Sequence, residues 1–585
     1  MAGGLAGAPT RLDAGERRTG HASTSEPLGD GGGAPDIIFI GAGINSLGAA
    51  LALAKAGWRV LVLDRNSTPG GAVRTMELTL PGFRHDIGAM NLSLLAGSPF
   101  YAEHRDALAR KGLELIVATH FFGSFAADGR LLGISTDPHA NLSAIARFSK
   151  ADAEAWKAWR ADYDRCSPVL FQVLGSPAVR SGPLELVFGT HRDLPHSVAT
   201  PLRGILLDSL RANLGRRFDV AQALIAAWAC ISTMPPTCPG GCWMPFLETN
   251  GDERTGIPLA RGGSGTMILA IVDLAREHGG RVVANQTVER ILVDEGKVAG
   301  LRLAGGRELR SARGVVASVT PQALVRLTTG HLPEAIVDAA SRYRYGPGTL
   351  VIHLALSRLP DWTDEAARRS FYVHIGPSLD AIAAAYQEGL AGMLARHPFC
   401  VVGQPTIYDP SRAPAGKHVL WIMVRAVPAE IRGDAAGVIQ DRTWTPAAAR
   451  AFADRVIRQI ARHAPGLPDA ILGMAIHTPV DLEALNPNLV DGDPERGQPS
   501  SLAVLRQPAL RGTRGPRDAH PGPLHVRRIH LAGGWGRAGL GNAPGQEALE
   551  REGVTGPPEQ RRTARGPPAS LSGPGPRDRC SGPAG

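Results

Sequence analysis

Two glycines and one acid near the start of the chain have the spacing of a nucleotide-binding turn. Gly41 and Gly43 follow an apolar run at 37–40, and Asp64 comes 21 residues after Gly43. The first glycine allows a turn too tight for a side chain, and the second lets backbone N–H groups approach a pyrophosphate. A carboxylate at this distance accepts hydrogen bonds from ribose hydroxyls. These residues therefore predict a site for the ADP part of a dinucleotide.

The segments around these residues are the ones that such a site needs. We predict a strand at 37–40, a helix of small residues at 47–56, and a second strand at 60–63 that ends on the acid. The helix start adds the positive end of its dipole to the pyrophosphate site. Ser46 stands where a third glycine would permit close packing of the helix against the strand. A serine costs little there because its side chain is small. The alternative is a glycine turn that binds no nucleotide, but such a turn needs no acid at this distance.

A second glycine pair follows the acid. Gly70, Gly71 and Arg74 lie in the segment PGGAVRT, a few residues beyond Asp64 and Arg65. The segment resembles the GGxxxT extension of the two-dinucleotide-binding-domain flavoproteins, which lies along FAD. By this resemblance the dinucleotide is FAD, and all five residues are predicted to contact it. Arg74 fits a surface charge equally well.

Two further segments resemble one branch of these flavoproteins. PGFRHDIG, which begins at Pro81, is similar to a stretch of the phytoene desaturase (carotenoid and retinoid oxidoreductase) family, above all the subgroup of pyridine nucleotide-disulphide oxidoreductase domain-containing protein 2 and its bacterial relatives. The segment 257–266 is similar to the one that returns the chain to the FAD domain. By that resemblance the backbone of Val288 meets the adenine, although an ordinary strand valine fits as well. His85 fits better as a core histidine than as a reacting group.

The resemblance implies a fold and a reaction. The fold would be α/β: a Rossmann-like FAD domain with an inserted α+β substrate domain. The enzyme would take a hydride from a C–H bond of an apolar or amphipathic small molecule onto the flavin and pass the electrons to an unknown acceptor. The sequence identifies no catalytic residue and no metal ligands, which suits a reaction that the cofactor carries. The alternatives are a flavin-fold binding or regulatory protein without catalysis, and a non-functional product.

The composition is that of a globular enzyme. The 585 residues, 43% of them apolar and 20% charged, allow two or more domains. The apolar stretch 47–62 is interrupted by Lys55 and Arg59, so no transmembrane segment is expected, and peripheral membrane contact stays open. Six cysteines fit a reducing compartment, so the cytoplasm is expected. For a eukaryotic chain the family resemblance implies the mitochondrial matrix. Cys238 and Cys242 lack a second pair or nearby histidines, so neither zinc nor a redox dithiol is expected.

Changes in pattern divide the chain into segments. In the second cofactor segment we expect Gly305 and Gly306 to close a hairpin between strands at 297–303 and 313–317. The predicted segments are a disordered extension (1–34), the first segment of the FAD domain (35–95), a mostly helical substrate or cap region (96–250), the second segment of the FAD domain (251–330), the second segment of the substrate domain (331–485), a return to the FAD domain (486–496) and a disordered tail (497–585).

The tail does not continue the family pattern. Residues 498–585 hold 13 Arg against 6 Asp plus Glu, which is +7 of the chain's +9, so the basic charge belongs to the tail and does not indicate nucleic acid. With suitable codons, reading 526–533 one base later gives Cys-Gly-Ala-Ser-Thr-Trp-Pro-Gly, which is similar to the family's missing C-terminal glycine motif. We therefore predict a frameshift near Gly497, and the glycines at 533–541 are not counted as cofactor ligands.

Overall fold

The computed structural model describes residue 28 and residues 33–175, 194–218, 235–376 and 378–494. The disordered extension predicted at 1–34 lies outside these residues except for 28, 33 and 34, and the predicted tail from 497 lies outside them altogether. Within the described ranges no helix has the length and apolarity needed to cross a membrane. The same residues contain no group of histidine, cysteine and acidic side chains that could hold a metal ion.

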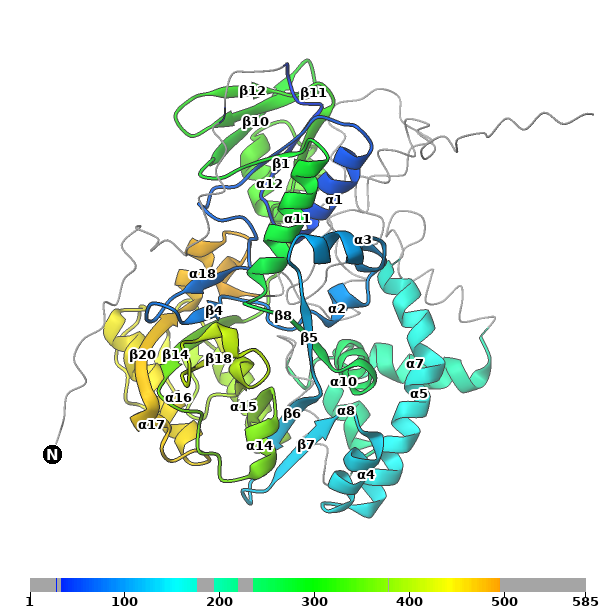
Figure 1. Ribbon diagram of the computed structural model, residues 1–585, viewed down its shortest axis with the longest axis vertical. Helices are drawn as coiled ribbons and strands as arrows, with labels where there is room; N and C mark the ends of the chain where they lie inside the picture. The colour runs from blue at the N-terminus through cyan, green and yellow to red at the C-terminus, as the bar shows by residue number, and fades with distance from the viewer. Residues whose placement is uncertain (1–27, 29–32, 176–193, 219–234, 377, 495–585) are drawn as a thin grey trace, which may run out of the picture.

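The cofactor domain is built on a parallel sheet. One outer strand, β13, pairs with β1, β1 pairs with β2, and β2 pairs with the other outer strand, β9. β1 lies in the upper part of the view in Figure 1. The sequences IIFI and VLVL form β1 and β2 because a parallel strand covered on both faces needs a continuous apolar run. The strands are β1 (Ile37–Ile40), β2 (Val60–Leu63), β9 (Arg281–Val283) and β13 (Gly314–Ala317).

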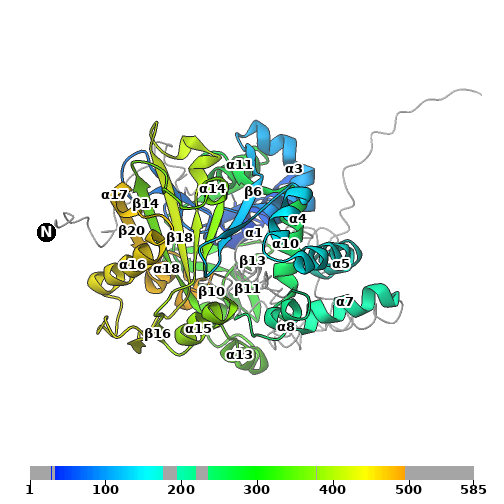
Figure 2. The same ribbon diagram turned by 90° about the horizontal axis from the view of Figure 1, so that it is seen from below.

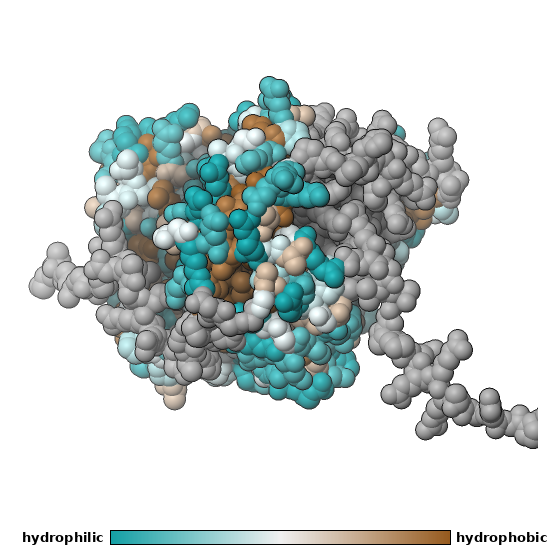
Figure 3. All heavy atoms as spheres, turned by 90° about the horizontal axis from the view of Figure 1, so that it is seen from above, coloured by the Kyte–Doolittle hydropathy of each residue, from teal (hydrophilic) through white to brown (hydrophobic). Residues whose placement is uncertain are grey.

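The two faces of this sheet are covered differently. Helices pack on one face, and a three-stranded antiparallel sheet packs on the other. The helices are α1 (Ile44–Lys55), α3 (Pro99–Arg110) and α11 (Gly265–Glu277); the strands are β10 (Val288–Asp294), β11 (Lys297–Leu303) and β12 (Glu308–Arg310). Seen from this end of the molecule, apolar side chains gather in a central strip between polar rims (Figure 3).

The substrate domain contains a seven-stranded mixed sheet in the order β20-β14-β18-β17-β15-β6-β7. One face packs against α16 (Pro446–Ala461), and the other face packs toward the helices α5, α10 and α15 (Figure 2). The strands are β6 (His120–Phe125), β7 (Leu131–Ser135), β14 (Gly348–Leu356), β15 (Tyr372–Ile375), β17 (Cys400–Gly403), β18 (His418–Val427) and β20 (Ile471–His477). The three helices are α5 (Lys150–Gly175), α10 (Trp243–Thr255) and α15 (Leu379–Leu390).

Shorter elements complete the two domains. They include the hairpin of β3 (Thr75–Glu77) and β4 (Arg84–Asp86), the pair of β5 (Leu115–Ala118) and β8 (Ile257–Ala260), and the pair of β16 (Met393–Leu394) and β19 (Gly433–Asp434). The remaining helices are α2 (Ser93–Ala96), α4 (Pro138–Ala146), α7 (His196–Leu207), α8 (Leu210–Gly215), α12 (Pro321–Thr328), α13 (Glu334–Ser341), α14 (Glu365–Arg369), α17 (Leu467–Ala470), α18 (Pro479–Leu485), η1 (Pro405–Ile407), η2 (Pro410–Arg412) and η3 (Val490–Gly492).

One sequence prediction about these elements was wrong. The strand after Gly305 and Gly306 that pairs with β11 is β12, whereas β13 joins the parallel sheet beside β1. β12 is only three residues long, with Leu309 between two charged side chains, so its pattern is too short to indicate a strand. The region predicted as mostly helical also supplies β5, β6 and β7, and the last two extend the substrate-domain sheet.

A buried ion cluster joins the two domains. Arg412 of η2 pairs with Asp86 of β4 and donates from Nε to Asp409 at 3.0 Å, and all three side chains are fully buried. Asp86 also accepts the backbone N–H of Ser264 at 2.9 Å, and Arg412 donates to the carbonyl of Ala260 at 3.1 Å. Burial opposes the charge of Arg412, but the two carboxylates raise its pKa above the ordinary value. The cluster therefore fixes the substrate domain against the start of α11 through paired charges.

Candidate cofactor site

The first glycine turn opens into free space at the start of α1. Gly41 has φ +90°, a conformation that favours glycine. A side-chain carbon added at Gly43 would meet nothing within 4 Å, and Gly43 provides no side-chain cap for α1. The buried atoms Asn45 Oδ1 and Ser46 Oγ in the first turn have no hydrogen-bond partner. Free backbone donors at a helix start suit an anion such as a pyrophosphate.

Asp64 lies directly behind this turn. Its side chain is buried, with one oxygen accepting the N–H of Ala42 at 2.8 Å and the other accepting the N–H of Asn66 at 2.9 Å. Each carboxylate oxygen has a second lone pair, so Asp64 can hold the turn and still accept a ribose hydroxyl. The sequence predicted that Asp64 accepts a ribose hydroxyl, but it did not predict that Asp64 also holds the glycine turn.

The second glycine pair touches the first turn. The N–H of Gly70 donates to the carbonyl of Ala42 at 2.9 Å, and Gly43 and Gly70 form a parallel bridge. At Gly70 an added side-chain carbon would lie 2.3 Å from the carbonyl oxygen of Val73, and at Gly71 it would lie 3.5 Å from the Cα of Gly43. The second loop therefore needs glycine at position 70, and the two loops meet at the start of α1.

Arg74 is buried, and its guanidinium donates to backbone carbonyls of two segments. Its Nε donates to the carbonyl of Gly71 at 3.0 Å, and its Nη2 donates to the carbonyl of Leu485 at 3.4 Å. The Nδ2 of Asn66 donates to the same Leu485 carbonyl at 3.4 Å. These bonds tie the second glycine loop to the segment that returns from the substrate domain. The surface-charge alternative for Arg74 is wrong because the side chain is only 1% exposed.

Arg65 and Val288 flank this site. Arg65 is exposed beside Asp64. Val288 begins β10 and is half-buried against the apolar cluster between the two cofactor-domain sheets. The segment just before it is bonded to the acid, since the N–H of Gln286 donates to the Asp64 carbonyl at 2.7 Å. The start of β10 therefore lies beside Asp64, where the adenine contact of Val288 is predicted.

The returning segment supplies two asparagines that the sequence did not indicate. The Nδ2 of Asn486 lies 3.7 Å from the position of an added carbon at Gly71. The Nδ2 of Asn488 donates to the carbonyl of Ser318 at 2.9 Å, and its Oδ1 accepts the N–H of Thr320 at 3.1 Å. The motif NPN after α18 could be seen in the sequence, but its residue types did not indicate which residues the two asparagines would contact.

Three buried histidines form a row where β4 meets the substrate-domain sheet. The ring of His353 on β14 lies 5.3 Å from that of His85 on β4 and 5.2 Å from that of His477 on β20. His85 Nε2 lies 2.8 Å from Thr79 Oγ1, and neither ring nitrogen of His353 has a partner. Burial lowers the pKa of His85 to about 3 and the pKa of His477 to about 4, and it holds the pKa of His353 well below the ordinary value.

We expect this row to make the protein sensitive to mild acid. The pKa of each histidine is lower in the folded chain than the ordinary value near 6.5, so below about pH 6.5 the unfolded chain binds more protons. The stability is fully present above that pH and is lost as the pH falls toward about 3, by up to about 1.4 kcal/mol per pH unit for each histidine. Urea unfolding at several pH values should show a smaller loss for His353→Leu than for the wild type or for His139→Leu, which changes an exposed histidine. The same pH dependence in all three would contradict the prediction.

Comparison with known proteins decides the family. Residues 47–431 match the family described as flavin containing amine oxidoreductase. The chain belongs to this family. It is 26% identical to pyridine nucleotide-disulfide oxidoreductase domain-containing protein 2 of Rattus norvegicus, over 77% of this chain and 82% of that protein. It is 28% identical to phytoene dehydrogenase of Streptomyces griseus, over 77% of this chain and 83% of that protein.

A solved structure shows the same fold. Cyclohexylamine oxidase from Brevibacterium oxydans has a TM-score of 0.51 to this chain at 16% identity, with 89% of this chain and 98% of that chain covered. The predicted family, the α/β fold class and FAD as the cofactor are therefore confirmed, and the protein is an FAD-dependent oxidoreductase. The open space at Gly43 and the uncapped start of α1 fit the cofactor.

Proposed function

We propose that this chain removes a hydride from a C–H bond of an apolar or amphipathic small molecule, in a dehydrogenase or desaturase reaction. Bound FAD would supply the ring that accepts the hydride. The observation that carries the proposal is the meeting of two glycine loops and a buried acid at the start of α1. The relatives named phytoene dehydrogenase and all-trans-zeta-carotene desaturase support an apolar substrate.

The residues of the glycine loops would hold the ADP part of the cofactor. In this proposal the backbone at Gly43 and the start of α1 bind the pyrophosphate, and the free lone pairs of Asp64 accept the ribose hydroxyls. The backbone at Val288 lies against the adenine. Arg74 acts as a positioning residue, since its bonds to Gly71 and Leu485 keep the second glycine loop closed on the first.

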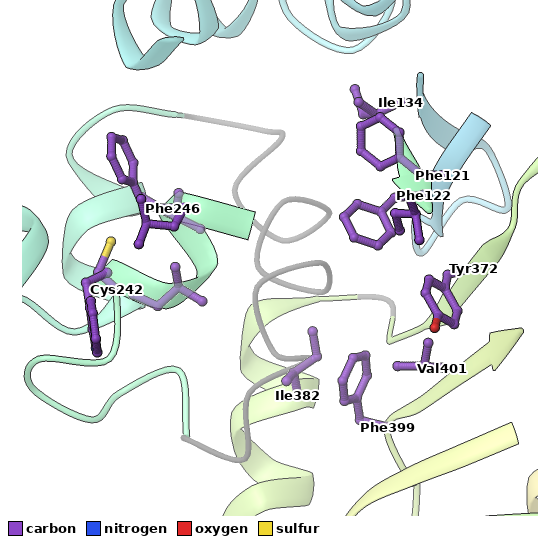
Figure 4. Close-up of a cluster of buried hydrophobic side chains, with 14 of the residues drawn as sticks. Phe121, Phe122, Ile134, Cys242, Phe246, Tyr372, Ile382, Phe399 and Val401 are labelled. Carbon is purple, nitrogen blue, oxygen red and sulfur yellow. The ribbon is translucent and has the colours of Figure 1, made fainter. Parts of the chain in front are cut away.

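The apolar face of the substrate-domain sheet would hold the substrate. Phe122 of β6 and Tyr372 of β15 lie across from Phe246 of α10 (Figure 4). These side chains belong to one large cluster of buried apolar residues between the sheet and the helices. An apolar environment of this kind excludes water, which strengthens polar interactions with a bound substrate. No electron acceptor for the reduced flavin is assigned.

Asp64→Ala is expected to weaken FAD binding strongly. The change removes the acceptor for ribose and also frees the Ala42 N–H that the carboxylate holds. The loss of charge-assisted hydrogen bonds, about 1.5–3 kcal/mol each, corresponds to roughly 10- to 150-fold in Kd. Titration with FAD, followed by flavin fluorescence, should show this loss, while Asp106→Ala at an exposed position should bind like the wild type. Equal affinities would contradict the assigned role of Asp64.

The reaction itself is tested on the flavin-loaded protein without oxygen. Candidate donors with apolar chains should bleach the flavin absorbance if the protein is a dehydrogenase or desaturase. A flavin that binds stoichiometrically but is never reduced by any such donor would instead favour a binding protein without catalysis.

A further inference from the structure

One face of α10 carries two buried polar side chains, each with an oxygen atom that has no hydrogen-bond partner. Thr249 and Asp252 are three residues apart, so they lie on the same side of the helix. Each is only 1% exposed, and neither Thr249 Oγ1 nor Asp252 Oδ2 makes a hydrogen bond. Buried polar atoms in folded proteins are almost always paired. The two unpaired atoms of Thr249 and Asp252 can therefore pair with a bound polar group.

The hydroxyl of Ser93 lies between two acceptors, Asn91 and Asp252. Ser93 Oγ lies 2.6 Å from Asn91 Oδ1 and 2.8 Å from Asp252 Oδ1. The N–H of Ser93 donates to the same Asn91 atom at 2.8 Å, which identifies that atom as the amide oxygen. A hydroxyl has one proton, so it cannot donate to both acceptors. If Ser93 donates to Asn91, the second contact needs a proton on Asp252 Oδ1.

The surroundings favour the same neutral state. Burial raises the pKa of Asp252 well above its ordinary value and outweighs the opposing effect of a Ser93 hydroxyl that donates to the carboxylate, while the nearby Glu248 raises the pKa further. A neutral carboxyl that donates from Oδ1 leaves Oδ2 as a pure acceptor. Thr249 Oγ1 can both donate and accept. This face of α10 therefore offers Asp252 Oδ2 as an acceptor and the hydroxyl of Thr249 as a donor.

This face of α10 lies where both domains meet. Glu253, four residues after Thr249, bonds the adjacent side of the helix to α4 and α5, since it accepts from Asn141 and Trp156. Asp252 instead contacts Ser93, which begins α2 in the loop that follows β4 of the cofactor domain. An ionised Asp252 would raise the pKa of the Tyr372 phenol, after the larger effects of burial and Asp86, so the two side chains are close. A group bound here would thus lie near the apolar cluster assigned to the substrate.

We propose that Thr249 and Asp252 bind a hydroxyl group of an amphipathic substrate, an inference that rests on the proposed function. The substrate hydroxyl donates to Asp252 Oδ2 and accepts from Thr249 Oγ1, so both unpaired atoms are satisfied at once. An aldehyde can only accept, and it leaves Asp252 Oδ2 unpaired. A hydrocarbon leaves both atoms unpaired. A carboxylate cannot donate to Asp252 and would be buried as an uncompensated charge.

Binding of matched ligands to the purified full chain tests the proposal. We would measure the affinities of farnesol, farnesal and farnesene by equilibrium dialysis, since these ligands share an apolar chain and differ in the polar end. The wild type should bind farnesol about tenfold more tightly than farnesene, with farnesal between them, as expected for one or two neutral hydrogen bonds. Thr249→Val and Asp252→Leu should remove the preference for farnesol and leave the affinity for farnesene unchanged.

Two further variants separate this role from a merely structural one. Asp252→Asn should keep the preference for farnesol within about threefold, because its amide can donate to Ser93 and still present an acceptor oxygen. Thr255→Val, at an exposed position on the same helix, should behave like the wild type. Asp252→Asn that loses the preference as completely as Asp252→Leu would overturn the neutral state of Asp252.

Other outcomes would overturn the whole assignment. They are no measurable binding of farnesol, equal affinity for farnesol and farnesene in the wild type, or a water molecule that still occupies the site in a crystal with farnesol bound elsewhere. The expected order of affinities without any reduction of the flavin by these ligands would support the site and count against the proposed reaction, so the two failures are distinguishable.

Discussion

Restoring the reading frame at Gly497 is expected to raise the affinity for FAD by about two orders of magnitude, or roughly 2.7 kcal/mol. The described chain reaches Pro494 just after the segment whose carbonyl at Leu485 accepts bonds from Arg74 and Asn66. The segment that returns from the substrate domain therefore touches the cofactor site at Leu485. By family resemblance the repaired frame would supply a glycine motif with further backbone donors for the flavin half of the cofactor.

The parallel sheet supports this expectation. β13 is one of its outer strands, and all four residues of β13 are half-buried, whereas every residue of β1 and β2 is buried. A partly open parallel strand has room for another element at its edge. Apolar contacts supplied there by the repaired segment would stabilise the cofactor domain as well as the bound FAD.

The measurement is the flavin released per protein after purification, compared between the present chain and the repaired chain. A control that ends at residue 496 should bind FAD as weakly as the present chain, because neither form contains the repaired segment. Stoichiometric FAD in the present chain would contradict the prediction. Sequencing the gene tests its basis, since an uninterrupted frame whose codons at 526–533 differ from those assumed would exclude the frameshift.

Removing the guanidinium of Arg412 is expected to destabilise the fold by about 3–5 kcal/mol, which is the cost of leaving a buried charge without its partner. Arg412→Leu leaves both Asp86 and Asp409 without their cation in the interior. Guanidinium-induced unfolding should show the loss as a lower midpoint. Because such a loss exceeds half the stability of many domains, the soluble yield should fall as well.

Matched variants show whether the buried charge is the cause. Arg105→Leu removes a guanidinium whose pair with Asp106 is exposed, and such pairs contribute about 0–1 kcal/mol. The double variant Arg412→Leu with Asp86→Asn should recover some of the stability, because one stranded charge is gone. A single variant as stable as Arg105→Leu would show that the cluster does not hold the domains together.

The N-terminal half of the site could be predicted because its determinants are local. β1, the glycine turn, α1 and β2 follow one another within one stretch, and the apolar runs, the positive φ of Gly41 and the position of Asp64 all depend on near neighbours. Both strands have the predicted bounds, and the helix begins three residues earlier than predicted. The FAD contacts assigned to the nine predicted residues stay predictions; these residues are Gly41, Gly43, Ser46, Asp64, Arg65, Gly70, Gly71, Arg74 and Val288.

The sequence alone determined the family and the cofactor and predicted the first half of the cofactor site, since a short βαβ unit encodes its own geometry. The tertiary structure decided which distant residues meet. Asp86 and Arg412 are 326 positions apart, Ser93 and Asp252 are 159 apart, and the three histidines come from three strands. Side chains alternate between the two faces of a strand, so the sequence of β18 could have predicted that Trp421 and Arg425, four residues apart, lie on the same face. No local pattern records the register between strands or the protonation of a buried carboxyl, because both depend on groups that only the folded chain brings together.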